Sequence, residues 1–260
     1  MVANLRNLYH YREMLGMWVF REIRVRYKQS FLGAAWAILQ PLVLMLMFTM
    51  VFSVMARFPT DGIPYPIFSY TALLPWTLFA TSVSFGVSSL INNMTLVTKT
   101  YFPREVLPIG VIGAALFDYL IASSIFIVML IYYQIPLTIH FLWIPVFLVI
   151  QIFLMMGIVL LGSAVTVFYR DVRFMVPLLV QLWLYATPII YPVTLVPEAY
   201  RTLYMLNPMA GIVESYRQVI LRGQPPNAMD LGLAAAVSVG LFVVSYIIFK
   251  KLEVRFNDII

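Results

Sequence analysis

The acids, histidines, lysines and cysteines of this chain decide which chemistry it can carry out. Its two histidines, His10 and His140, lie far apart, and it has no cysteine, so neither a metal-spaced histidine pair nor a thiolate site is available. None of its four lysines follows a glycine, so it lacks the Gly-x-x-x-x-Gly-Lys-Ser/Thr phosphate loop. The acids are spread too thinly for nucleophile–base pairs. We therefore expect no enzyme, no metal site and no nucleotide site in this chain.

Asp118 is the one acid that falls well inside a long apolar run. An ionisable group in a bilayer costs about 3 kcal/mol and often marks a functional site. A lone acid is a poor proton relay, so we favour a structural interpretation. It predicts that Asp118 bonds a hydroxyl of a neighbouring helix or an arginine near the cytoplasmic side. A role in transport is the alternative.

Composition indicates which elements must hold these residues. Of the 260 residues 62% are apolar and 11% are charged, whereas a soluble domain carries about 25% charged residues. Several apolar runs exceed the roughly 20 residues that a helix needs to cross a bilayer. The sequence predicts an all-α integral membrane protein with a cytoplasmic amphipathic interface helix at 1–30 and a single transmembrane domain at 31–260. The six predicted spans are 33–56, 67–91, 109–133, 141–168, 174–191 and 231–249.

The basic residues predict the orientation of these spans. Of the 17 Lys and Arg residues, only Arg57, Arg201, Arg217 and Arg222 fall on the side opposite the N-terminus. Because Lys and Arg concentrate in cytoplasmic segments, both termini are predicted to be cytoplasmic. The net charge of +6 is explained by this asymmetry, and we expect no nucleic-acid partner. The first thirty residues are too polar for a secretory signal peptide.

The segment Asn4 to Lys28 is predicted to be an amphipathic helix in the cytoplasmic interface. Apolar residues recur in it at helical spacing, and Arg21 shares another face with Lys28. Glu22 is expected to pair with Arg26 one turn later. We expect Trp18 to enter the acyl boundary and the arginines to lie among headgroups. Docking of a partner subunit on the polar face is the alternative.

The segment 194–223, between the fifth and sixth spans, is predicted to form a re-entrant hairpin. Its two halves are each too short to span, and the chain bends at Asn207-Pro208 because proline cannot donate a backbone hydrogen bond. Glu214 and Arg217 lie one turn apart and are expected to neutralise each other. Irregular backbone at that depth must be buried by protein. The hairpin either closes a channel on the outside or caps the bundle.

Four segments carry a family resemblance that covers the chain from about residue 20 to the C-terminus. Asn92 to Glu105 resembles the loop after the second span in the polysaccharide-exporting branch of the ABC-2 permeases, which includes O-antigen permeases of the Wzm type, capsule exporters and teichoic-acid exporters. The other segments that resemble this branch are Arg21–Tyr27 with Leu32–Trp36 and Gln40-Pro41, then Phe168–Val172, and finally Thr187–Tyr191 with Asn207-Pro208.

The resemblance implies a homodimer that encloses one channel and binds two ATP-binding cassette subunits on its cytoplasmic side. ATP and Mg²⁺ would be held by those subunits, with no cofactor in this chain. The residues that would contact the ATPase are Asn92, Leu96, Lys99, Phe102, Pro103, Arg104, Arg170 and Asp171. For the first loop the alternative is ordinary positive-inside charge. For Arg170 and Asp171 the alternative is an ion pair within the turn.

Aromatic residues make up 15% of the chain. Many belong to interfacial girdles and packing. Those inside the spans are candidates for a channel, because an aromatic ring can support the C–H face of a sugar without fixing the register of a sliding polymer. The channel candidates are Tyr70, Trp76, Phe79, Phe85, Tyr119 and Tyr185. The gate candidates in the hairpin are Asn207, Pro208, Glu214 and Arg217.

The sequence thus predicts the multi-pass membrane subunit of a bacterial inner-membrane exporter, which moves a lipid-linked, O-antigen-like polysaccharide outward. Its partners would be a second copy, the two ATPases, the glycolipid and membrane lipid. The alternatives within the superfamily are a capsule or teichoic-acid exporter and a drug or small-lipid exporter. A membrane enzyme of lipid-linked glycan synthesis and a non-transporting scaffold are alternatives of another class.

Overall fold

The computed structural model describes residues 11–60 and 62–256, and every regular element in this part of the chain is helical. The predicted interface helix at 1–30 is therefore described only from Tyr11 onward, and its first ten residues lie outside the described part of the chain. The α-helices are α2 (Arg12–Tyr27), α3 (Trp36–Phe48), α4 (Tyr65–Gly86), α5 (Met94–Lys99), α6 (Val106–Tyr132), α7 (Ile144–Phe168), α8 (Val172–Tyr185), α9 (Glu198–Met205), α10 (Pro208–Ile220) and α11 (Ala228–Glu253). Short turns of other helix types are Gly33–Ala35, Thr49–Met55, Ile91–Asn93, Ile139–Trp143 and Val193–Leu195.

Four helical stretches are long and apolar enough to cross a bilayer. They are Gly33–Met55, Val106–Tyr132, Ile139–Phe168 and Ala228–Glu253, and each coincides with a predicted span. A fifth arises if Tyr65–Gly86 and Ile91–Lys99, which meet at a bend of 50°, count as one span. The fifth predicted span falls on α8, which has 14 residues and so covers about 21 Å. The structure thus confirms that the described part of the chain is all-helical and has four to five candidate spans, whereas the count of six stays a prediction.

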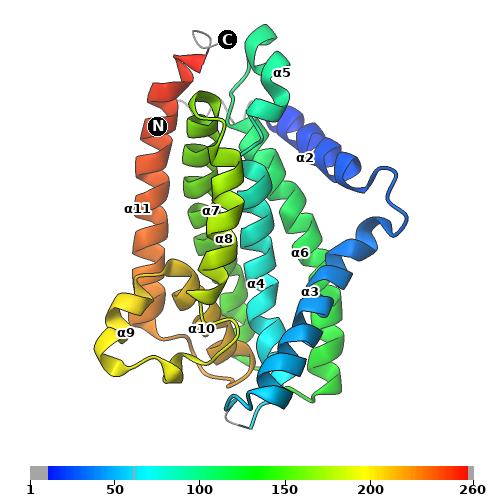
Figure 1. The fold of residues 1–260 in the computed structure, drawn as a ribbon, viewed down its shortest axis with the longest axis vertical. Helices are drawn as coiled ribbons and strands as arrows, with labels where there is room; N and C mark the ends of the chain where they lie inside the picture. The colour runs from blue at the N-terminus through cyan, green and yellow to red at the C-terminus, as the bar shows by residue number, and fades with distance from the viewer. Residues whose placement is uncertain (1–10, 61, 257–260) are drawn as a thin grey trace.

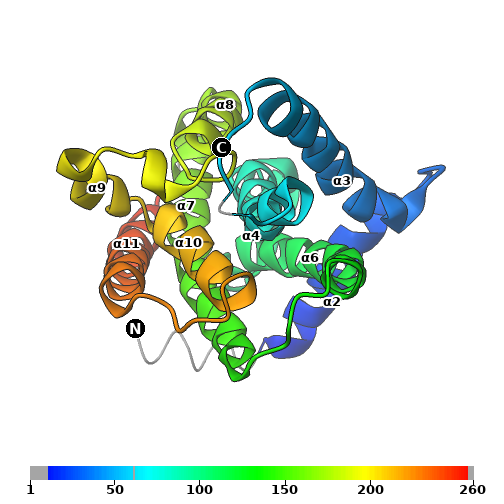
Figure 2. The ribbon, with the colours of Figure 1, turned by 90° about the horizontal axis from the view of Figure 1, so that it is seen from below.

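Helix α4 forms the centre of the bundle. Figure 2 shows α4 and α10 inside a ring made by α3, α6, α7, α8 and α11. Most side chains of α4 are buried, including Tyr70 and Phe79. Pro75 interrupts the backbone hydrogen bonds of α4, and the Gln151 amide of α7 donates to the Pro75 carbonyl at 2.6 Å. A polar side chain of a neighbouring helix thus bonds the backbone of α4 beside its proline.

The two ends of the bundle differ in composition. Figure 1 shows α2, α5 and the C-terminal end of α11 at one end, and α9 and α10 at the other. The first end carries most of the basic residues. Along the bundle, α7 packs closely on α11 because Gly157 lets the helices approach: a Cβ at Gly157 would lie 3.0 Å from the backbone nitrogen of Phe242. The predicted concentration of basic residues on one side of the spans is therefore present in the fold.

Helix α2 packs against α6, and two of its predicted contacts are wrong. Trp18 lies on Gly110, where a Cβ would come within 2.3 Å of the Trp18 ring, so this indole contacts protein instead of acyl chains. Arg26 turns inward to Asp118 instead of pairing with Glu22. Periodicity could not reveal either contact, since α6 offers glycine and an acid where α2 approaches. The face of α2 that carries Met17 and Phe20 is exposed.

Candidate translocation surface and coupling ends

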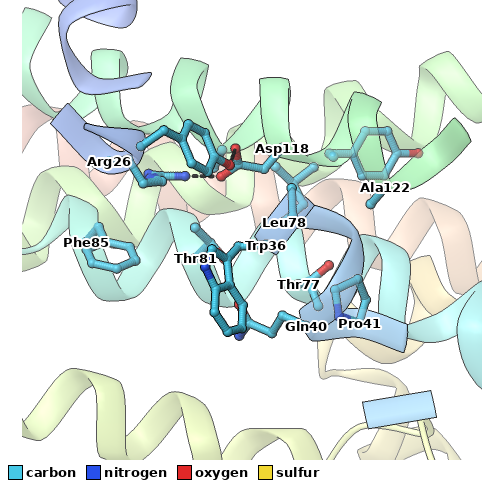
Figure 3. Close-up of a pocket in the computed structure, with 14 residues that line it drawn as sticks. Arg26, Trp36, Gln40, Pro41, Thr77, Leu78, Thr81, Phe85, Asp118 and Ala122 are labelled. Atoms are coloured by element: carbon cyan, nitrogen blue, oxygen red, sulfur yellow. Dashed lines mark hydrogen bonds and ion pairs between the residues drawn. The ribbon is translucent and has the colours of Figure 1, made fainter. Parts of the chain in front are cut away.

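A cavity of about 340 Å³ lies between α2, α3, α4 and α6 (Figure 3). Its walls combine aromatic rings, hydroxyls, a carboxamide and one ion pair. This mixture of flat apolar surfaces and a few polar groups is typical of ligand sites. The residues that carry these groups are Arg26, Tyr27, Trp36, Gln40, Thr77, Thr81, Phe85, Asp118 and Tyr119.

The charged wall of the cavity is a three-residue cluster. Asp118 of α6 forms an ion pair with Arg26 of α2 and accepts a hydrogen bond from the Tyr27 hydroxyl. Both members of the ion pair are less than one-fifth exposed. Burial and the bond to Asp118 raise the pKa of the Tyr27 phenol, so its hydroxyl stays protonated and can donate. Both contacts expected of Asp118, an arginine and a hydroxyl of a neighbouring helix, are present, and the cluster attaches α2 to the bundle.

The six aromatic channel candidates separate into three environments. Phe85 and Tyr119 line the cavity, and the Tyr119 hydroxyl lies 3.3 Å from the Tyr216 hydroxyl. Tyr70, Trp76 and Phe79 belong to the core of the chain; the Phe79 ring, for example, meets the Trp183 ring edge to face with centroids 5.2 Å apart. Tyr185 is exposed on α8. Trp36 also lines the cavity. The sequence indicated it only as part of a family motif and not as a channel candidate.

An apolar groove of about 510 Å³ runs beside α8. It is lined by α4, α7 and α8 through residues such as Val83, Ile158, Leu179 and Trp183. The outer surface of α8 is apolar as well, with Phe174, Leu178 and Leu182 among its exposed side chains. The apolar surface of helix α3 is similarly exposed, since only Pro41 and Met45 of this helix are buried. Two of the bundle's helices therefore present wide apolar faces.

Asn207 fastens the predicted hairpin to α8. Its side-chain oxygen caps α10 by accepting from the Met209 amide at 3.1 Å and also accepts from the Trp183 indole at 3.0 Å. Its amide nitrogen donates to the Ala186 carbonyl at 3.0 Å and the Thr187 hydroxyl at 3.1 Å. Pro208 follows at the first position of α10, where its missing N–H costs nothing.

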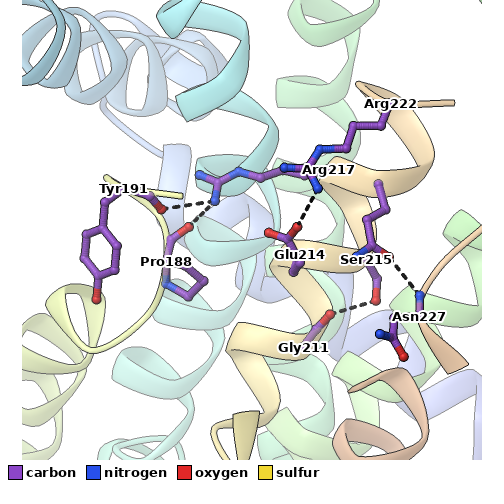
Figure 4. Close-up of polar contacts among 9 residues, drawn as sticks. Pro188, Tyr191, Gly211, Glu214, Ser215, Arg217, Arg222 and Asn227 are labelled. Atoms are coloured by element: carbon purple, nitrogen blue, oxygen red, sulfur yellow. Dashed lines mark hydrogen bonds and ion pairs between the residues drawn. The ribbon is translucent and has the colours of Figure 1, made fainter. Parts of the chain in front are cut away.

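Arg217 and Glu214 do not form the expected pair (Figure 4). Glu214 pairs with Arg222, 3.4 Å away. The Arg217 guanidinium, which is buried, donates to the carbonyls of Pro188, Ile189 and Tyr191, the last at 3.3 Å. Three free carbonyls follow the end of α8 there, and they draw the guanidinium away from Glu214. Helix α10 is thus buried and joined to α8 at two points, whereas α9 is largely exposed.

The loop predicted to bind the ATPase contains both exposed and anchored residues. Asn92 and Lys99 are exposed, and Leu96 and Pro103 are partly buried. Phe102 is only 6% exposed and packs into the core. Arg104 donates to the Glu253 carbonyl of α11. Tyr101, in the same loop, is 97% exposed. It was not among the predicted contacts, because the sequence does not show which aromatic residue of a loop faces outward.

The second predicted contact is the turn between α7 and α8. Arg170 and Asp171 are both exposed. Within the described residues no ion pair joins them, and the Asp171 carbonyl instead accepts from the Phe174 amide at 2.9 Å as α8 begins. Both side chains are therefore available to a partner. Within the same described residues no three His, Asp or Glu side chains gather into a possible metal site.

Comparison with known proteins adds to this geometry. The sequence profile of the ABC-2 type transporter family matches residues 15–221. The chain is 36% identical to the O-antigen export system permease protein RfbA of Myxococcus xanthus, over 99% of both chains. It is 29% identical to a protein of the same name from Klebsiella pneumoniae, over 98% of this chain and 97% of that one. It is 26% identical to the polysialic acid transport protein KpsM of Escherichia coli, over 86% of this chain and 87% of that one.

Proposed function

The chain belongs to the ABC-2 type transporter family, and we propose that it is the membrane subunit of an exporter that moves a lipid-linked, O-antigen-like polysaccharide out of the cytoplasm. The observation that carries this proposal is the similarity to O-antigen permeases along almost the whole chain. A capsule exporter is the second candidate, since KpsM is also similar over most of its length.

We propose six crossings of the bacterial inner membrane with both termini in the cytoplasm. Helix α4 would supply the second crossing, because it runs through the centre of the bundle. Helix α8 is too short to cross alone. The segment that follows it, up to Tyr191, would complete the fifth crossing, because Arg217 satisfies its backbone carbonyls. Helix α10 would enter the outer leaflet as part of a re-entrant hairpin, which agrees with its burial among other helices.

The assembly would be a homodimer with two ATP-binding cassette subunits. The bare apolar faces of α3 and α8 support a dimer, since both could be covered by a second copy. ATP and Mg²⁺ would be bound by the cassettes, because this chain lacks the phosphate loop. The exposed residues of the loop, Asn92, Lys99 and Tyr101, would contact the cassette, while Phe102 and Arg104 hold the loop in position. Arg170 and Asp171 would form the smaller contact.

The cavity beside α3 would contact the polymer. Its aromatic residues Trp36, Phe85 and Tyr119 offer flat surfaces for the C–H faces of sugars. Gln40 and Thr81 offer groups that bond sugar hydroxyls. The buried residues Tyr70, Trp76 and Phe79 would then support these walls instead of contacting the polymer.

The test is export itself. In cells that lack this chain, lipid-linked polysaccharide should accumulate on the cytoplasmic side and disappear from the surface, and expression of the chain with its ATPase should restore export. The purified chain should bind no ATP by itself and should hydrolyse ATP only as a complex. Unchanged surface polymer in the deletion strain would overturn the proposal.

A further inference from the structure

The end of α11 and the residues just beyond it contact both cytoplasmic segments that are predicted to meet the ATPase (the coupling segments). The first contact is with Glu105, which directly follows the coupling loop, Asn92 to Arg104, and is only 3% exposed. Its carboxylate forms an ion pair with Lys250 and accepts a hydrogen bond from the Tyr246 hydroxyl at 3.3 Å. The preceding residue, Arg104, donates to the Glu253 carbonyl. Arg104 and Glu105, at the end of the loop, are thus fixed to three residues of α11.

The second contact is made by Phe256, just beyond α11. Phe256 is fully buried, and its ring lies 5.9 Å from that of Phe168, the last residue of α7. Phe168 is followed at once by the turn that carries Arg170 and Asp171. The Arg104 guanidinium also lies 5.4 Å from the Phe256 ring centre. One short segment of the C-terminal region therefore touches both coupling segments.

Helix α11 extends from this point to the opposite end of the bundle. There its first turn lies against α10, where a Cβ added to Gly211 would come within 2.9 Å of the Asp230 carbonyl oxygen. Packed helices rearrange between discrete arrangements instead of deforming continuously, so a shift of one helix is passed to a neighbour that it contacts this closely. A displacement of the α11 end would consequently reach the hairpin without passing through α4 or α8.

We propose that Glu105 and Lys250 are positioning residues for coupling, which lock the loop to α11 so that movements imposed by the ATPase pass along α11 to the hairpin. This inference rests on the proposed function. A buried ion pair contributes little net stability but fixes a geometry well. That property suits a joint whose task is to transmit a displacement. Tyr246 shares the carboxylate and holds its orientation.

The test compares four variants in the reconstituted complex with its ATPase. Glu105→Gln removes the charge and keeps the length of the side chain, and Lys250→Met does the same for its partner. The double variant E105Q/K250M leaves no unpaired buried charge, so it should fold as well as the wild type. We expect all three to bind the ATPase normally but to export at least several-fold less polymer per ATP hydrolysed. The charge exchange E105K/K250E should recover much of that ratio.

Glu253→Gln is the matched control, because it removes the more exposed ion pair of Lys250 at 2.8 Å and leaves Glu105 untouched. It should keep the wild-type ratio. If the double variant exports as much polymer per ATP as the wild type, the inference is wrong. The inference is also wrong if the single variants lose export only in proportion to a lowered thermal midpoint and the double variant recovers both the midpoint and the export per ATP. If the wild-type chain binds no ATPase, the proposed function fails instead.

Discussion

The indole nitrogen of Trp183 donates to the side-chain oxygen of Asn207 at 3.0 Å, which ties the last turn of α8 to the first turn of α10. The same asparagine caps α10 and donates to the backbone that follows α8. One side chain thus both begins α10 and joins it to α8.

Asn207→Ala should lower stability by about 2 kcal/mol or more, because it removes a helix cap and several tertiary hydrogen bonds. Asn207→Asp keeps the oxygen that accepts and loses the amide that donates, so its effect should be smaller. The thermal midpoint of the detergent-solubilised protein measures both. Equal midpoints for Asn207→Ala and the wild type would contradict this role.

Arg26→Met should weaken the attachment of α2 to the bundle. It leaves the part-buried carboxylate of Asp118 without its ion partner, at a cost of about 3 kcal/mol. The double variant R26M/D118N should recover part of the loss. Protease cleavage within α2, together with the thermal midpoint, reports the change. Arg24→Met, at an exposed position of the same helix, is the control and should match the wild type.

Substitutions of the neighbouring residues Tyr101 and Phe102 should have different effects. Tyr101→Ala should change stability by less than about 0.5 kcal/mol, because the side chain is exposed, yet it should weaken ATPase binding about tenfold. Phe102→Ala should cost about 3 kcal/mol, because it leaves a cavity in the core. Pull-down of the ATPase and thermal denaturation separate the two effects. Normal ATPase binding by Tyr101→Ala would remove this residue from the contact.

The hairpin as an outer closure predicts labelling that depends on the state of the transporter. The chain has no native cysteine, so Leu206→Cys, which is 49% exposed beside Asn207, supplies a single target. Its reaction with a membrane-impermeant thiol reagent should differ at least threefold between the resting and ATP-bound complexes if α10 shifts. Tyr200→Cys on the exposed helix α9 should react equally in both. Equal rates at Leu206→Cys would favour the hairpin as a fixed cap.

The sequence by itself determined the class of the protein, its apolar segments and the distribution of charge between the loops. These follow from local properties: a helix must be apolar over a fixed length to cross a bilayer, and basic residues concentrate on one side. The missing phosphate loop was equally visible, because such motifs are contiguous. The break at Asn207-Pro208 was also visible, because it follows from the proline itself.

Only the tertiary structure decided which side chains and carbonyls the polar residues bond. Glu214 pairs with Arg222 and not with Arg217, because free carbonyls at the end of α8 attract Arg217. Trp18 packs on protein because α6 presents a glycine there. These choices depend on residues that are distant in the sequence, and helices that are apolar on every face give no periodic signal of which side meets a neighbour.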